Sequence, residues 1–386
     1  MGKKRGAGEG TIVQLPSGSW RGQITLDRGR LSFTAKTRRE VQDWIRKMAV
    51  QVDAGLSYDG ATTSVTEFMH GWLQSAQPSL RAKTHQQYTQ VARDHILPYI
   101  GHMKLLALRP DQVQKMYDRL LANGNSARIV QLSHSILHRA LDSALKMGSV
   151  TRNVTDATTP ARPKKRTIQV LTEEELDRLL VAAEGHRYKV LVYLAVVTGM
   201  REGELFGLRW SDIDWLTGEI HITRQVQDIR GQGAVYVDPK TDAGRRTVVI
   251  GAQVVELLKW QYQWVGTMRR FDKRGIWKEH DLVFPSTRGT PIIHSNFHKE
   301  WKKILEAAKL PHMRFHDLRH LAASILLVKL RKSPTEVAAI LGHAKTSTTL
   351  DIYGHMLPGM SQQTASEIEA VVMPTIVKQD TDEKRK

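Results

Sequence analysis

The strongest constraint on the fold is a segment, residues 187–197, that is strongly apolar and therefore predicts a buried helix. Such a helix needs other elements around it, so a larger globular domain is expected from Leu171 onwards. The segment runs into Thr198-Gly199-Met-Arg201-Glu-Gly203-Glu204, where two glycines permit a sharp turn into a second helix. Arg201 is expected near a helix N-terminus, which favours anions. Glu204, three residues later, would brace its guanidinium, although an ordinary surface ion pair is the simpler alternative.

The charge of the chain favours a polyanionic partner. Its 386 residues carry a formal net charge of +18, and the pI is about 10.0. Nucleic acid and an anionic membrane surface both fit this excess. No apolar run of about 18 residues occurs, and no apolar segment follows the basic N-terminus, so we expect neither membrane insertion nor a signal peptide. Cysteine is absent, which excludes disulfides, thiolate metal sites and a cysteine nucleophile, and a cytoplasmic location is expected.

Residues 1–55 predict a small three-stranded sheet packed on a helix. Short β-like runs at 11–15, 20–26 and 31–34 are separated by turn signals, and Thr37 with Glu40 forms a capping box before an apolar helical stripe. A basic sheet of this size can lie in a DNA groove. A solvated basic face is the alternative. The candidate DNA-binding residues here are Lys3, Lys4, Arg5, Arg21, Arg28 and Arg30.

Residues 62–154 predict a four-helix, bundle-like domain. A capping box at Ser64 and Glu67 begins its first helix, and further helices are expected at about 83–96, 110–122 and 126–147. Its basic residues are scattered and by themselves indicate little. Residues 155–168 form a basic linker, of the kind expected where a chain crosses DNA, although many exposed linkers look the same. Its candidate DNA-binding residues are Lys164, Lys165 and Arg166.

Residues 169–375 predict a mostly α-helical domain with a small antiparallel sheet, so the whole chain is expected to be multidomain α+β. Strands are expected at 219–226, 234–237 and 246–250. The segment 238–244 is expected to connect the last two strands tightly, which would place Lys240 near a hairpin tip. Most such lysines are simply solvated, but a lysine beside a cleaved phosphodiester can protonate the departing oxygen. Helices follow at about 296–308, 315–330, 333–341 and 346–353, and residues 376–386 are expected to be a disordered tail.

Arginine, histidine and tyrosine recur between residues 316 and 353. The chain reads His316-Asp-Leu-Arg319-His320, then Leu-Gly-His343, then Asp-Ile-Tyr353. Arginine grips phosphate oxygens with a planar fork. A tyrosine hydroxyl can become a covalent nucleophile if its pKa is lowered from about 10. The stretch therefore predicts the binding and attack of a phosphodiester.

Collected in chain order, these boxes resemble those of the tyrosine recombinase family, the lambda-type phage integrases. The set is Arg201, Lys240, His316, Arg319, His343 and Tyr353. The resemblance covers the whole chain and implies a three-domain integrase, with an arm-site DNA-binding domain, a core-site DNA-binding domain and a catalytic domain. Leu321 departs from the family, whose members often carry threonine there, and we expect an effect on packing only.

The resemblance implies a site-specific recombinase that cuts and rejoins DNA through a 3′-phosphotyrosyl intermediate. Arg201 and Arg319 would clamp the phosphate oxygens, His343 would add a donor, and Tyr353 would attack phosphorus. Lys240 would protonate the leaving 5′ oxygen, while His316 would either assist proton transfer at the tyrosine or support the phosphate. The implied partners are double-stranded DNA with core-type and arm-type attachment sites, a homotetrameric synapse, and DNA-bending and directionality factors. No cofactor is expected, and the implied setting is the nucleoid of a bacterium that carries a phage or other mobile element.

Three other interpretations of the same residues were weighed. His312, His316 and His320 are spaced as on one helix face and suggest a metal site, but Pro311 and the interleaved arginines argue against it, so no metal is expected. A type IB topoisomerase would use the same chemistry without needing an arm-binding domain or two spaced DNA sites. A non-catalytic DNA-binding regulator would leave Tyr353 and Lys240 without a purpose.

Overall fold

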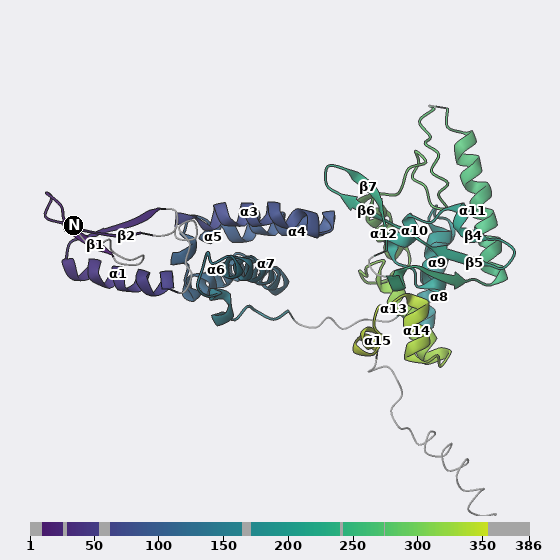
Figure 1. Ribbon diagram of the computed structural model, residues 1–386. Coiled ribbons are helices and arrows are strands. Elements are labelled where there is room, and N and C mark those ends of the chain that lie inside the picture. The colour runs from purple at the N-terminus through teal and green to yellow at the C-terminus, as the bar shows by residue number, and fades with distance from the viewer. Residues whose placement is uncertain are drawn as a thin grey trace, which may run out of the picture. The chain divides into compact units, whose positions relative to one another are not determined.

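The computed structural model describes residues 10–25, 29–53, 62–163, 171–239, 242–273 and 275–353. The chain divides into two compact units, Met1–Arg166 and Thr167–Lys386, and each is described by itself. Figure 1 shows helices and small sheets in both. The expected α+β class is confirmed. The predicted domain boundaries, including the linker at 155–168 and the tail at 376–386, remain predictions. Within the described ranges, none of the helices combines the length and apolar character needed to cross a membrane.

The first unit begins with three antiparallel strands in the order β1-β2-β3, followed by a helix. The strands are β1 (Thr11–Gln14), β2 (Trp20–Thr25) and β3 (Arg30–Ala35), and the helix is α1 (Arg38–Asp53). The predicted capping box is present, since the amide of Glu40 donates to Thr37 Oγ1 at 3.3 Å and the amide of Thr37 donates to Glu40 Oε2 at 3.1 Å.

One face of this sheet packs on α1, and the other is polar. Gly22 allows the close approach, because a Cβ there would lie 2.6 Å from Val41 Cγ1. Phe33, opposite Gly22 in the register, stacks on Trp44 of α1 with 5.5 Å between ring centroids. Side chains alternate across a strand, so Arg21 points away from the helix. The face turned away from α1 is therefore mostly polar, with Val13 exposed beside Arg21.

The rest of the first unit is helical, as predicted. Its elements are α3 (Val65–Ala76), α4 (Ala82–Val91), α5 (Leu97–Ile100), α6 (Pro110–Ala122) and α7 (Ala127–Lys146). The expected helix at 83–96 is α4 extended by a π-helical turn, η2 (Ala92–Ile96). The capping box of Ser64 and Glu67 is present. Apolar side chains from these elements form a separate core.

In the second unit, helices surround the buried α9 (Lys189–Thr198), which is the predicted strongly apolar helix. The others are α8 (Glu173–Glu184), α10 (Glu202–Phe206), α11 (Ala252–Arg270), α12 (His294–Ala307), α13 (Asp317–Ser324), α14 (Pro334–Leu341) and α15 (Thr346–Tyr353). The predicted helix at 315–330 is α13 continued by the π-helical turn η7 (Ile325–Lys329).

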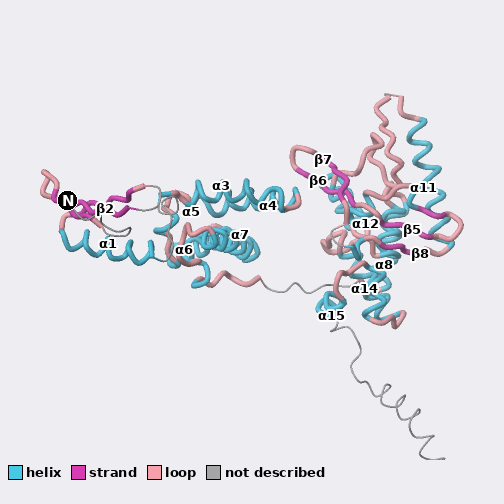
Figure 2. Tube along the Cα trace, in the orientation of Figure 1, coloured by secondary structure: helices cyan, strands magenta, loops and turns pink. Residues whose placement is uncertain are grey.

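The strands of the second unit differ from the prediction and form two small antiparallel sheets (Figure 2). β4 (Ile213–Asp214), β5 (Glu219–Ile222) and β8 (Arg246–Val249) make one sheet, and β6 (Gln225–Ile229) pairs with β7 (Gly233–Val237) in the other. The expected strand at 219–226 is thus two strands in different sheets. The expected pairing across residues 238–244 was wrong, because β7 and β8 each pair with another strand. That segment links two sheets and is not a hairpin tip.

Candidate active site

Arg201 lies at the junction of two helices, as the sequence predicts. Helix α9 ends at Gly199, which has a left-handed backbone with φ of 60°, and Arg201 is the N-cap residue of α10. Its guanidinium is held in two directions. Nη1 donates to Glu204 Oε1 at 2.7 Å, and Nη2 donates to the carbonyl of Gly342 at 2.8 Å. The first arginine of the site is therefore oriented before any ligand binds.

Arg319 is the more deeply buried arginine, with 3% of its surface exposed. Nη1 donates to the carbonyl of Gly199 at 2.8 Å, and Nη2 donates to the carbonyl of Leu341 at 2.6 Å. Burial, followed by the positive charges of Arg201 and Arg246, lowers the pKa of Arg319 to about 9. The guanidinium thus stays charged at neutral pH, and an anion would relieve the repulsion that it experiences. We call Arg201 and Arg319 the arginine clamp.

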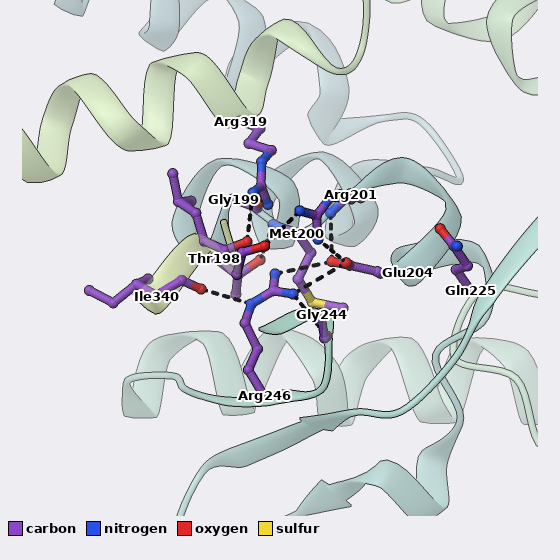
Figure 3. A network of polar contacts seen from close by, with 12 residues as sticks. Thr198, Gly199, Met200, Arg201, Glu204, Gln225, Gly244, Arg246, Arg319 and Ile340 are labelled. Atoms are coloured by element: carbon purple, nitrogen blue, oxygen red, sulfur yellow. Dashed lines mark hydrogen bonds and ion pairs between the residues drawn. The ribbon is translucent and has the colours of Figure 1, made fainter. Parts of the chain in front are cut away.

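A buried carboxylate, Glu204, joins Arg201 of the clamp to a third arginine, Arg246 (Figure 3). Glu204 is 2% exposed and accepts hydrogen bonds from Arg201 and Arg246. Burial alone would raise the pKa of Glu204, but the charges of Arg246 and Arg201 hold it below its usual value. The contact between Glu204 and the Arg201 guanidinium is the one that the predicted bracing role requires. The pair is too buried to be an ordinary surface ion pair.

Arg246 is a site residue that the sequence interpretation did not single out. Its Nη2 donates to Glu204 Oε2 at 3.0 Å, and its Nε donates to the carbonyl of Ile340 at 2.8 Å. Its side chain is only 7% exposed. Arg246 begins strand β8, so this strand carries a buried charge into the site. The available signal was its place in the basic run Gly244-Arg-Arg-Thr247, which closely follows Lys240.

Two glycines allow the chain to approach the arginines closely. Both have left-handed backbones, with φ of 60° at Gly199 and 68° at Gly342. A Cβ on Gly199 would lie 2.5 Å from Leu341 Cδ2, and one on Gly342 would lie 2.6 Å from the carbonyl oxygen of Ala243. The carbonyls of these glycines accept from Arg319 and Arg201 respectively. The glycines thus bring backbone acceptors to the clamp at positions that other residues would block.

Two histidines adjoin the arginine clamp. His316 is the N-cap residue of α13, and His343 follows the end of α14 at Gly342. Nδ1 of His343 lies 2.8 Å from Oγ1 of the buried Thr349. Desolvation by the surrounding protein, followed by the charge of Arg319, lowers the pKa of each histidine to about 4. Both rings are therefore neutral at physiological pH, although His316 keeps access to solvent.

Tyr353 ends helix α15, and its ring is 1% exposed in a small apolar cluster with Leu327, Val337 and Leu341. Its hydroxyl lies 2.5 Å from Nδ1 of His320. Burial raises the pKa of Tyr353 to about 12, and the charge of Arg319 acts in the opposite direction. The phenol therefore needs a base before it can act as a nucleophile at neutral pH.

His320 is a second residue that the sequence interpretation missed. It was considered only as one of three possible metal ligands with His312 and His316. The structure places His312 in an exposed segment before α13, and the ring of His320 lies 5.6 Å from that of Tyr353. The rings of His316 and His320 are in edge-to-face contact at 5.6 Å. The spacing of His316 and His320 was the available signal. It correctly suggested that the two rings lie close together, but the partner of His320 is Tyr353 and not a metal.

The structure thus gathers five of the six predicted catalytic residues, Arg201, His316, Arg319, His343 and Tyr353, around one site. Lys240 lies outside the described residues, as do the DNA-binding candidates Lys3, Lys4, Arg5, Arg28, Lys164, Lys165 and Arg166. Arg21 and Arg30 are exposed on the N-terminal sheet. They are not part of this site.

Two family models match the chain. The model described as the phage integrase family matches residues 169–359, and that of the N-terminal SAM-like domain of phage integrases matches residues 64–121. The first match contains every residue of the site just described. The second falls in the helical block of the first unit.

Relatives and solved structures agree with these matches. A tyrosine recombinase XerC-like protein of Caldanaerobacter subterraneus is 28% identical over 85% of this chain and 88% of its own length. The ICEBs1 integrase of Bacillus subtilis is 24% identical over 90% of this chain and 94% of its own. In fold, the Tn1549 transposon integrase in complex with a circular intermediate DNA gives a TM-score of 0.68 at 16% identity, covering 81% of this chain and 100% of that one. A lambda integrase dimer bound to a core site gives a TM-score of 0.59 at 18% identity, covering 91% of this chain and 97% of that one. The chain therefore belongs to the phage integrase family, the tyrosine recombinases, which are enzymes of site-specific DNA strand cleavage and joining.

Proposed function

We propose that this chain cuts and rejoins DNA at specific sites through a covalent 3′-phosphotyrosyl link to Tyr353. The observation that carries the proposal is the Tyr353 hydroxyl, held at 2.5 Å from a histidine nitrogen in a site that also contains two buried or half-buried arginines. A nucleophile, a base and a set of charged donors are the parts that attack on a phosphodiester requires.

The arginine clamp would bind the non-bridging oxygens of the scissile phosphate. Each of these guanidinium groups makes two hydrogen bonds in the structure. A guanidinium has more N–H groups than these two, and the others can donate to phosphate oxygens. His343 would add a donor from Nε2, because Nδ1 faces Thr349. In-line attack increases the negative charge on these oxygens, and donors held ready for that charge usually make the largest contribution to catalysis.

His320 would accept the proton of Tyr353 as the hydroxyl attacks phosphorus. The contact is direct, and Tyr353 keeps its proton at neutral pH unless a base removes it. The sequence left two roles open for His316, and the contact of His320 with the tyrosine favours phosphate support for His316. His316 is neutral at physiological pH and faces the positive charges of Arg319 and Arg201.

Lys240 would protonate the 5′ oxygen that leaves the phosphorus. The proposal rests on the resemblance of its box to that of the family, because the residue lies outside the described ranges. We expect Lys240→Ala to bind DNA normally and to cleave slowly. A substrate with a 5′-thio leaving group needs no proton and should restore cleavage. Failure of the thio substrate to restore it would remove Lys240 from this role.

Strand joining would reverse these steps with a different DNA end. The phosphodiester bond is replaced by a phosphotyrosyl bond of similar energy, so a free 5′-hydroxyl can attack the link and release Tyr353. The exchange consumes no ATP. The reacting groups needed for it are side chains of this chain, so no cofactor is assigned to the reaction.

The proposed DNA partners are a core-type site for the helical and catalytic parts and an arm-type site for the N-terminal sheet. Arg21 pairs in register with Thr34, and Arg30 pairs with Thr25. Directly opposed residues lie on the same face of a sheet. Both arginines are exposed on the face turned away from α1. Two positive side chains on a polar sheet face fit a DNA groove.

The proposed assembly is a homotetramer on two DNA sites. A lambda integrase tetramer bound to a Holliday junction is among the structures of similar fold. We further propose that the element is a phage or an integrative mobile element, that DNA-bending and directionality factors assist the reaction, and that it takes place in the nucleoid of a bacterial cell.

Strand exchange between plasmids that carry paired attachment sites tests this function. The wild type should produce recombinants, and Tyr353→Phe should produce none. Relaxation of supercoils by the wild type without recombinants would point instead to the topoisomerase alternative. Tyr353→Phe with wild-type recombination would overturn the catalytic role of this tyrosine.

A further inference from the structure

A second polar cluster lies beside the arginine clamp and takes no part in the proposed chemistry. Glu202 follows Arg201 as the first residue of α10. Its Oε1 lies 3.0 Å from Nδ1 of His294 and 2.8 Å from Nε2 of His298. The histidines are four residues apart on α12, so they occupy one face of that helix. Two helices that are distant in the sequence thus converge on a single carboxylate oxygen.

The three groups have the composition of a transition-metal site. Their ligand atoms all lie within 4.8 Å of one another. Two imidazole nitrogens and a carboxylate oxygen form a known zinc donor set, and imidazole favours zinc-class ions over Mg²⁺ or Ca²⁺. His294 and Glu202 are largely shielded, whereas His298 is 52% exposed at its side chain. The exposed side leaves room for a water ligand to complete a tetrahedron.

The surroundings orient these ligand atoms. The ring of His294 lies against Phe206 with 5.1 Å between centroids, and its Nε2 is buried with no hydrogen-bond partner among the residues that the structure describes. Nδ1 is therefore the nitrogen that faces Glu202. Oε1 of Glu202 lies between this nitrogen and Nε2 of His298, so one carboxylate oxygen faces both rings. The nearest residue in sequence that would repel a cation, Arg201, is paired with Glu204.

We propose that Glu202, His294 and His298 bind a zinc-class divalent cation that fastens α10 to α12. The ion would be structural, because the proposed cleavage needs no metal. This revises the expectation that the chain has no metal site. That expectation rested on His312, His316 and His320, and nothing in the sequence connects Glu202 with a helix about 90 residues later. By holding the first turn of α10, the ion would steady the segment that carries Arg201.

Binding of Co²⁺ and Zn²⁺ to the full-length protein without a histidine tag tests the proposal. We expect the wild type to bind a single Co²⁺ with the strong visible absorption of a tetrahedral site, and Zn²⁺ to displace it and raise the melting temperature. Loss of a partner outside the ligand set typically lowers metal affinity by about 10–100-fold, so Glu202→Gln and His298→Gln should each lower it by at least about 100-fold. Affinity should also fall as the pH is lowered, because protons compete with the metal for its ligands.

His138→Gln is the matched control, since His138 forms a histidine–carboxylate pair of similar length, 3.0 Å to Asp156, and no third ligand atom of the described residues lies within 4.8 Å of both. Its metal affinity should equal that of the wild type. The exposed His298→Gln should also keep the fold, so that a loss of binding reports on the site. Equal Co²⁺ affinity in the wild type and His298→Gln would overturn the proposal. So would a wild type that binds no ion while the variants lose stability, because the cluster would then be an ion pair only.

Discussion

The two halves of the active site are held in different ways. In the arginine clamp, Arg201 bonds to the buried carboxylate of Glu204, which also pairs with Arg246, and the two arginines donate to three backbone carbonyls. Among the described residues, the Tyr353 side chain is held by a hydrogen bond to His320 and by a small apolar cluster that is distinct from the main core of the unit. The clamp is thus part of the folded framework, whereas the nucleophile is attached to it at few points.

This difference corresponds to two different tasks, stabilising charge on the phosphate and supplying the nucleophile. Donors that are fixed in advance need no reorganisation when charge develops on the phosphate. A buried tyrosine with a pKa of about 12 is unreactive until a base removes its proton. A change in the clamp should therefore affect folding and catalysis together, and a change on the nucleophile side should affect catalysis alone.

The largest combined effect is expected from Glu204→Gln. The change removes the negative charge shared by two arginines and leaves the buried Arg246 without its ion partner. Breaking such a buried pair costs about 3 kcal/mol or more of stability. Denaturant unfolding should show this loss, and cleavage should fall with it. Glu256→Gln, which breaks an exposed pair with Lys259, is the control and should change stability by less than about 1 kcal/mol. Equal stability in the two variants would contradict the framework role of Glu204.

His320→Gln should slow cleavage by about 100-fold, the lower end of what a general base contributes. DNA binding and the melting temperature should stay near those of the wild type, because His320 is only partly buried. Its cleavage rate should also rise more steeply with pH than that of the wild type, since the tyrosine must ionise unaided. His312→Gln, in the exposed segment before α13, should behave as the wild type. A variant with normal rates and a normal pH profile would remove His320 from proton transfer.

Thr349→Val should slow cleavage by about tenfold. The hydroxyl of Thr349 donates to Nδ1 of His343 in the tautomer that keeps Nε2 protonated towards the phosphate. Loss of this bond leaves a shielded nitrogen unsatisfied, at a cost of about 1 kcal/mol or more. Ser347→Ala, on the exposed side of the same helix, is the control for helix α15. Equal rates in the two variants would show that the orientation of His343 does not limit cleavage.

The last prediction concerns the stability of the fold at acid pH and not the rate of cleavage. His316 and His343 have folded-state pKa values of about 4, below the ordinary value of 6.5. Between these values the unfolded chain binds more protons than the folded one, so stability should fall as the pH drops from about 6.5 to about 4. In thermal melts, the melting temperature of His343→Asn should depend less steeply on pH than that of the wild type. An unchanged slope would mean that His343 is not held neutral.

Much of this site could be predicted from local sequence. The strongly apolar helix at 187–197 and the glycine that ends it placed Arg201 at a helix junction, and three-residue spacing paired it with Glu204. The capping boxes at Thr37 and Ser64 correctly predicted where helices begin, because the partner of each lies only three residues away. Patterns of this range depend only on the geometry of one turn.

Contacts between distant segments could not be predicted in this way. Arg246 reaches Glu204 only because β8 pairs with β5, whereas alternation alone suggested that it paired with β7. His320 on α13 and Tyr353 on α15 are 33 residues apart in the sequence and meet only in the folded chain. Spacing on one helix had suggested that His320 was a metal ligand. Tertiary packing decided each case, and it leaves no trace in a local pattern.

The most direct test of the whole account is covalent trapping on a duplex that is nicked next to the scissile phosphate. The short fragment diffuses away after cleavage, so the covalent protein–DNA link accumulates. The account predicts a stable adduct with the wild type, attached at Tyr353 and to a 3′ DNA end, no adduct with Tyr353→Phe, and much slower adduct formation with His320→Gln. An adduct formed by Tyr353→Phe, or a link to a 5′ end, would contradict it.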